Sequence, residues 1–259
     1  MVAASAALEA EDHSEQMDRI DARERLIVAL DLPDIARAGE MAQGLDEAVD
    51  FYKVGLSLQM AVGVEKFIQS TLDDRKKLFL DYKYYDIPET LTKAVSQAAA
   101  RGVTFLTVHG SSEMIRAAVK GRGDSLKLFT VTVLTSWDKS DLLEMGYTQH
   151  TVEEIVLSRA KIALDACCDG VVASGHEAQA IKNLSRKNKK QLLVLTPGIR
   201  QDGYPEDDQK RRMSPRQAIQ AGADYLVIGR PITDAPDPLA SAKSILSEMQ
   251  EAFDRITNR

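Results

Sequence analysis

Eight short, strongly apolar segments recur along the chain, and each is followed by a stretch whose apolar residues have helical spacing. The segments are rich in β-branched and large hydrophobic residues and end near Gly, Asp or Ser, which is typical of buried strands. We predict strands over residues 26–31, 51–56, 77–82, 105–110, 127–134, 170–175, 191–196 and 225–230. The amphipathic stretches predict helices, among them residues 35–45, 88–101, 151–167, 176–188 and 238–256.

The regular alternation of strand and helix favours one architecture. Strands that are apolar along their whole length need cover on both faces, as in a parallel sheet flanked by helices. We therefore expect a (β/α)8 TIM barrel, an α/β fold, as a single domain over residues 26–259. A doubly wound open sheet is the alternative, but no GxGxxG opens a helix after the first strand. Residues 1–25 are expected to form a mobile or loosely docked N-terminal extension.

Composition and charge argue against several classes of function. The chain has 33 Lys and Arg against 39 Asp and Glu, a net charge of -6, which is unlike a general binder of nucleic acid or anionic membranes. No apolar run approaches the ~18 residues of a membrane span. Cys167 and Cys168 are adjacent and too close for an unstrained disulfide, so we expect a reducing, cytoplasmic location. His13, His150 and His176 lack metal-ligand spacing, so no metal site is predicted.

Polar residues end several of the predicted strands. In a barrel of this kind the active site is built at the carboxyl ends of the strands. Asp31 ends the first strand, and Lys53 lies within the second. Gly229 and Arg230 end the eighth. A solvated residue at one strand end is ordinary, but the coincidence of several on one rim indicates a functional site.

The third strand carries the most informative cluster of charges. Period-two alternation places Asp81 and Lys83 on the same face, toward the barrel mouth, and Asp86 lies beyond the strand end. Charges on a mostly buried strand are costly to desolvate unless they are paired, so we expect a tight Asp–Lys–Asp array. A salt bridge that only fixes the barrel top is the structural alternative. A lysine held between carboxylates stays protonated, which suits it to deliver a proton rather than to form a Schiff base.

The residues around this cluster resemble a known family. The element Asp81-x-Lys83-x-x-Asp86-Ile87-Pro88-x-Thr90, preceded by Asp31 and Lys53, is similar to the orotidine 5′-phosphate decarboxylase family. The resemblance runs from about residue 25 to the end of the chain, in order, through LTS at 134–136, TPGIR at 196–200, DQ at 208–209 and GRPI at 229–232. The DxKxxDIPxT element is highly specific, whereas PGIR and IGRPI alone are less so.

The resemblance implies decarboxylation of orotidine 5′-monophosphate to uridine 5′-monophosphate and CO2, the last step of pyrimidine nucleotide synthesis. It implies a homodimer that uses no metal and no organic cofactor. Lys83 is then the donor of a proton to C6 of the pyrimidine, and Asp81 lies beside the departing carboxylate. Asp86, with Ile87 and Thr90, is expected to enter the site of the partner subunit.

The resemblance also implies which residues hold the substrate. Asp31 and Lys53 are expected to bind the ribose hydroxyls, and either Thr135 or Ser136 to contact the pyrimidine edge. The phosphate is expected to meet Gln209, Gly229 and Arg230, with Arg200 at the base of a closing loop over residues 201–212. This segment is long, polar and punctuated by Gly and Pro, as a loop that closes over a phosphate should be.

Two alternative functions stay open. The related 3-keto-gulonate 6-phosphate type of decarboxylase shares the barrel, the DxKxxD array and a phosphate grip, but uses magnesium and an enediolate. It lacks the continuation Ile87-Pro88-x-Thr90 and the pair Thr135-Ser136. The other alternative is a non-catalytic barrel that binds a phosphorylated ligand. The presence of every expected catalytic residue argues against this alternative.

Overall fold

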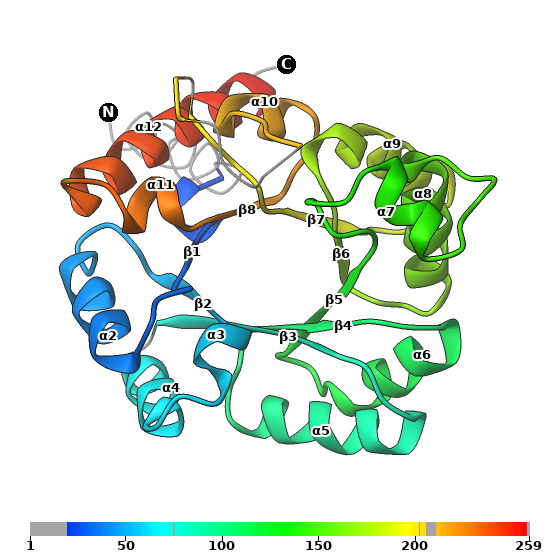
Figure 1. Cartoon of the computed structure of the whole chain (residues 1–259), viewed down its shortest axis with the longest axis horizontal. Coiled ribbons are helices and arrows are strands. Elements are labelled where there is room, and N and C mark those ends of the chain that lie inside the picture. Colours follow the sequence, from blue (N-terminus) through cyan, green and yellow to red (C-terminus); the bar gives the residue numbers. More distant parts are fainter. Residues whose placement is uncertain (1–19, 75, 202, 206–210, 258–259) are drawn as a thin grey trace, which may run out of the picture.

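The computed structural model describes residues 20–74, 76–201, 203–205 and 211–257. In it, parallel strands close into a barrel in sequence order, and the last strand pairs with the first. Figure 1 looks into this barrel and shows the helices as a ring outside it. The predicted (β/α)8 barrel is therefore confirmed. Its strands are β1 (Leu26–Ala29), β2 (Phe51–Gly55), β3 (Lys77–Tyr84), β4 (Phe105–Val108), β5 (Lys127–Val131), β6 (Gly170–Val172), β7 (Leu193–Thr196) and β8 (Tyr225–Ile228).

The helices begin at residues suited to that position. In α8, for example, Thr151 accepts a hydrogen bond from the N–H of Glu154, whose carboxylate accepts one from the N–H of Thr151. The five helices predicted above all form, with ends within two residues of the prediction. The helical elements are η1 (Ala22–Glu24), α2 (Ile35–Gly44), α3 (Leu56–Gln59), α4 (Val64–Asp73), α5 (Pro88–Ala100), α6 (Ser112–Gly121), α7 (Lys139–Glu144), α8 (Val152–Asp165), α9 (Gly175–Lys187), α10 (Pro215–Gln220), α11 (Arg230–Thr233) and α12 (Pro238–Thr257).

Most strands end earlier than predicted, and one ends later. The apolar pattern marks burial, and burial continues past the last residue of the hydrogen-bonded ladder. Thus β1 ends at Ala29, before Asp31, and β8 ends at Ile228, so that Arg230 begins a short helix instead of ending a strand. In contrast, β3 continues to Tyr84, two residues beyond its predicted end. The loops that follow the strands therefore carry much of the barrel mouth.

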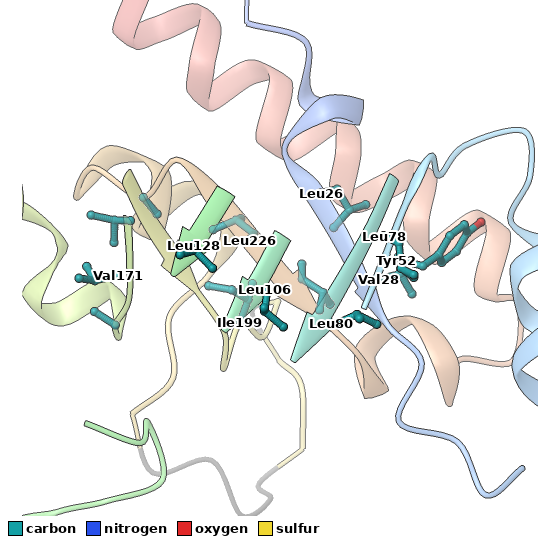
Figure 2. Packing of buried hydrophobic residues seen from close by; sticks show 14 of the residues in the cluster. Leu26, Val28, Tyr52, Leu78, Leu80, Leu106, Leu128, Val171, Ile199 and Leu226 are labelled. Carbon is teal, nitrogen blue, oxygen red and sulfur yellow. The ribbon is translucent and has the colours of Figure 1, made fainter. Parts of the chain in front are cut away.

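The core has two layers separated by the sheet. Aromatic rings fill the barrel interior, where the ring centroids of Phe105 and Phe129 lie 4.6 Å apart and those of Phe51 and Phe105 lie 4.8 Å apart. Alternate residues of each strand point outward and pack under the helices. Figure 2 shows this outer layer, with labelled side chains such as Leu26, Val28, Leu78, Leu80 and Leu106. Each fully buried leucine contributes about 1.5–3 kcal/mol of hydrophobic stabilisation.

The described residues before β1 pack against the last helix. The N–H of Ala22 donates to Oε1 of Gln250 over 2.9 Å, and Nε2 of Gln250 donates to the carbonyl of Ile20 over the same distance. Ala22 is buried in the core. Residues 1–19 lie outside the described part of the chain, so the division into an extension and a barrel domain stays a prediction. In the described residues, none of the helices combines the length and apolarity needed to cross a membrane.

Candidate active site

A cavity of about 730 Å³ opens at the carboxyl ends of the strands. Its inner wall is apolar and includes Phe79, Val172, Leu195 and Val227, whereas its mouth is charged. Most of the residues predicted to bind or convert a substrate line this cavity. They are Asp31, Lys53, Asp81, Lys83, Thr135, Ser136, Arg200, Gly229 and Arg230. The fold thus brings together residues that lie up to about two hundred positions apart in the sequence.

Charged side chains of alternating sign form a continuous array in the cavity. Nζ of Lys53 lies 2.9 Å from Oδ1 of Asp31. The same ammonium lies 3.5 Å from Oδ2 of Asp81. Nζ of Lys83 lies 2.8 Å from Oδ1 of Asp81. The carboxylate of Asp81 is therefore held between two ammonium groups, which offsets the cost of burying it.

The array differs from the one expected from the sequence, because Asp86 takes no part in it within this chain. Asp86 is exposed, and its Oδ1 accepts a hydrogen bond from the N–H of Ile87 over 2.7 Å. Among the ion pairs of the described residues, Lys83 is paired with Asp81 and not with Asp86. The reason is that β3 ends at Tyr84, after which the chain leaves the barrel mouth. Asp31 supplies the second carboxylate of the array, and it pairs with Lys53 and not with Lys83.

The surroundings of Asp81 keep it ionised. Burial alone raises the pKa of this carboxyl group. The charges of Lys53 and Lys83, together with hydrogen bonds from Lys83 and Thr107, outweigh burial and hold the pKa of Asp81 below its usual range. The cavity therefore presents a fixed negative charge directly beside the ammonium of Lys83.

The backbone at Lys83 is irregular. Its φ of 47° lies in the left-handed region, which non-glycine residues rarely adopt. The pairing of β3 with β4 also shifts register between Leu80 and Tyr84. Asp81 and Lys83 do meet, as the alternation predicts, but they meet across a distorted segment and not along a regular strand. Such distortions re-aim side chains and concentrate at functional sites.

Sequence reasoning missed three residues that support the array. Thr107 in β4 is fully buried, and its Oγ1 donates to Oδ1 of Asp81 over 2.9 Å and accepts from the N–H of Lys83 over 3.0 Å. At Gly55, a Cβ atom would lie 2.9 Å from Oδ1 of Asp31, so a larger residue would displace this carboxylate from its present position. A polar residue inside an apolar strand, and a glycine at a strand end, are the signals that could have found them.

The third missed residue is His109, which directly follows β4. Its ring meets that of Tyr85 edge to face, with centroids 5.8 Å apart. Burial, and then the charges of Arg159 and Lys83, hold the pKa of His109 below its usual value. His109 is therefore neutral near pH 7 and adds no positive charge beside Lys83.

The predicted contacts for a pyrimidine and a phosphate line the mouth of the same cavity. Thr135 is buried and Ser136 is half-buried in the loop after β5, so the choice between them stays open. Arg200 is buried after β7, where its guanidinium lies over the ring of Tyr204, 5.2 Å from the centroid. Gly229 and Arg230 lie at the junction of β8 and α11.

Other predicted site residues are not brought to this cavity. Ile87 is 66% exposed, and Thr90 is exposed in the first turn of α5. Gln209 lies outside the described residues, as do other parts of the loop predicted over residues 201–212, so these predictions are untested. The described part of the chain, within residues 20–257, holds no group of three or more His, Cys, Asp and Glu arranged for a metal ion.

The fold and the cavity define a class of protein, a TIM barrel whose charged site lies at the carboxyl ends of the strands. A model of the family described as orotidine 5′-phosphate decarboxylase / HUMPS family matches residues 24–245. The chain belongs to this family, and the resemblance drawn from its motifs is confirmed.

Individual relatives are similar over nearly the whole chain. An orotidine 5′-phosphate decarboxylase of Nitrobacter winogradskyi is 48% identical over 90% of this chain and 95% of its own length. One of Methylococcus capsulatus is 44% identical over the same shares. The crystal structure of orotidine 5′-phosphate decarboxylase from Lactobacillus acidophilus superimposes with a TM-score of 0.73 at 33% identity, covering 87% of this chain and 98% of that one.

Proposed function

We propose that this chain decarboxylates orotidine 5′-monophosphate to uridine 5′-monophosphate and CO2, with Lys83 as the proton donor. The relatives that match it over nearly their whole length are carboxy-lyases with this substrate in their names. The observation that carries the proposal is the pair formed by Lys83 and Asp81, 2.8 Å apart in the cavity. The cation can stabilise the electron pair that CO2 leaves behind, and the anion can repel the substrate carboxylate before CO2 leaves.

The chemical step follows from the charges. The bond from C6 to the carboxylate breaks with its electron pair left on C6, and CO2 departs. This pair lies in the plane of the ring, so the ring cannot delocalise it, and a nearby cation is the effective stabiliser. C6 then takes a proton from Nζ of Lys83, which regains its proton from water.

Asp81 contributes by its fixed position beside the departing carboxylate. It is held by Lys53, Lys83 and Thr107, so it cannot turn away from the substrate. Repulsion between the two carboxylates ends when CO2 leaves, which favours the transition state over the bound substrate. Binding energy from the distant phosphate offsets this repulsion in the complex.

Substrate binding is assigned to the remainder of the cavity mouth. Asp31 and Lys53 hold the ribose hydroxyls, and Thr135 or Ser136 contacts the pyrimidine edge. Gly229 and Arg230 take the phosphate together with Gln209, and Arg200 lies at the base of the loop after β7. A cavity of about 730 Å³ suits a nucleotide of this size, since ligand pockets usually measure ~300–1,000 Å³.

The active unit is a homodimer in which Asp86, Ile87 and Thr90 complete the partner's site. Support comes from their position, because these residues come soon after β3 and yet are exposed and do not line their own cavity. The large aromatic side chain of Tyr85, next to Asp86 in the sequence, is also 70% exposed. Exposed apolar groups of this size are typical of surfaces that another chain covers.

The reaction as proposed needs no metal and no organic cofactor, and a cytoplasmic location without nucleic-acid or membrane partners remains the prediction from composition. The test is to follow the absorbance of orotidine 5′-monophosphate with purified protein in EDTA. We expect turnover. Its absence, or its recovery only after addition of magnesium, contradicts the proposal and favours the enediolate chemistry of the sugar-phosphate decarboxylases.

A further inference from the structure

We infer that Thr107 is a positioning residue: its buried hydroxyl holds the Asp81 carboxylate and the Lys83 backbone in the geometry that the reaction needs. Thr107 lies in β4 and does not itself line the cavity. The inference rests on the proposed function, because the geometry that it protects is that of the proposed proton donor.

The direction of each hydrogen bond at Thr107 is fixed by chemistry. A backbone N–H can only donate, so the N–H of Lys83, 3.0 Å away, must point at a lone pair of the hydroxyl oxygen. The ionised carboxylate of Asp81 can only accept, so the hydroxyl hydrogen must point at its Oδ1, 2.9 Å away. One hydroxyl thus links the backbone of the proposed donor to the side chain of its counter-ion.

This hydroxyl replaces a backbone acceptor where the sheet is irregular. Leu80 pairs with Leu106 and Tyr84 with Val108, so four steps along β3 are matched by only two along β4. The regular ladder resumes where the N–H of His109 donates to the carbonyl of Tyr84 over 2.9 Å. Between these points, the hydroxyl of Thr107 accepts the hydrogen bond from the N–H of Lys83 in a partly buried site. The left-handed conformation of Lys83 is therefore supported from β4.

Thr107 also decides which way the Asp81 carboxylate faces. Oδ1 of Asp81 accepts from both Lys83 and Thr107, whereas Oδ2 faces Lys53 at the longer distance of 3.5 Å. Without the hydroxyl, the carboxylate is free to rotate toward Lys53, and the ammonium of Lys83 loses its fixed counter-ion. The expected loss falls on the chemical step, because Thr107 is hydrogen-bonded to Asp81 and Lys83 and not to a residue assigned to the phosphate or the ribose.

The test compares two conservative substitutions of Thr107. Thr107→Val keeps the shape and removes the hydroxyl, and Thr107→Ser keeps the hydroxyl and removes a methyl group. We expect Thr107→Val to lower kcat by about 10- to 100-fold, the range for loss of a hydrogen bond to a charged group. KM and the Kd of uridine 5′-monophosphate should stay within about threefold, and Thr107→Ser should keep kcat within about threefold of the wild type.

The control is Thr130→Val, which removes the hydroxyl of a buried threonine in β5 that makes no contact with Asp81 or Lys83 in the described structure. Its kcat should equal that of the wild type. Wild-type kcat in Thr107→Val overturns the inference, as does an equal loss in Thr107→Ser or a parallel loss of product affinity, which would indicate a general packing role. If the wild-type protein itself fails to convert orotidine 5′-monophosphate, the proposed function fails instead, so the two failures are distinguishable.

Discussion

The ammonium of Lys83 combines two roles at one atom, since it stabilises the carbanion and then protonates it. Loss of a stabilising donor typically costs ~10²–10³-fold in rate, and loss of a general acid ~10²–10⁴-fold. We expect Lys83→Ala to lower kcat by at least about 10³-fold, measured by the absorbance assay. Product binding should change little, because uridine 5′-monophosphate is held mainly by its ribose and phosphate.

The matched control for this substitution is Lys120→Ala, which removes an ammonium group exposed on α6. It should leave kcat and KM unchanged. A folded Lys83→Ala variant with wild-type turnover removes Lys83 from the mechanism and leaves Asp81 without its proposed partner in the reaction.

Residues of the site differ in how far sequence predicts them. Asp81 and Lys83 are predictable because charged residues in an apolar strand must be paired, and alternation places them together. Thr107 is not, because its importance depends on the register between β3 and β4, which no pattern within one strand contains. The distance between Asp86 and Lys83 within one chain is not predictable for a related reason, because it depends on where β3 ends.

At the scale of elements, the strand order and closure could be predicted, whereas the strand ends could not. The alternation of apolar strands and amphipathic helices sets the barrel, because parallel strands require cover on both faces. The end of the ladder depends on hydrogen bonds to neighbouring strands, and the apolar pattern does not record these. Asp31 and Leu134, the predicted ends of β1 and β5, therefore lie in loops, and Arg230, the predicted end of β8, begins α11; all three line the cavity.

The interior aromatic layer supports this cavity from below, and Phe105 lies at its centre. Its ring centroid lies 4.6, 4.8 and 4.9 Å from those of Phe129, Phe51 and Tyr225. Phe105→Ala opens a void that the closed barrel cannot collapse to fill. We expect the free energy of unfolding, from urea denaturation, to fall by about 3–5 kcal/mol.

A surface substitution serves as the comparison for Phe105. Met145 is 60% exposed after α7, and Met145→Ala should change the free energy of unfolding by no more than about 0.5 kcal/mol. If Phe105→Ala costs no more than Met145→Ala, the aromatic layer does not support the barrel in the way that its packing indicates.

For the whole molecule, net charge describes the surface and not the site. The total of -6 argues against polyanion binding, yet the proposed substrate carries a phosphate and a carboxylate. Besides Arg37 of α2, four cationic side chains line the cavity, Lys53, Lys83, Arg200 and Arg230. Their placement follows from the fold, because they come from β2, β3 and the segments after β7 and β8. The amino-acid composition alone does not predict this placement.

The proposed dimer makes each site depend on two chains, and mixed dimers test this. In a dimer of one Lys83→Ala subunit and one Asp86→Ala subunit, one site lacks both groups. The other site combines the intact Lys83 of its own chain with the intact Asp86 of its partner. Random exchange between equal amounts of the two inactive proteins makes half of the dimers mixed, so about a quarter of wild-type activity should return.

The same experiment separates shared from self-contained sites. If Asp86 acted within its own chain, every site in the mixture would lack either Lys83 or Asp86, and no activity would return. Exchange must be verified, for example by mass spectrometry of subunits that differ in mass. Verified mixed dimers without activity contradict the shared site. They would also mean that the exposure of Asp86, Ile87 and Thr90 in this chain needs another explanation, such as closure of the loop after β3 onto its own cavity.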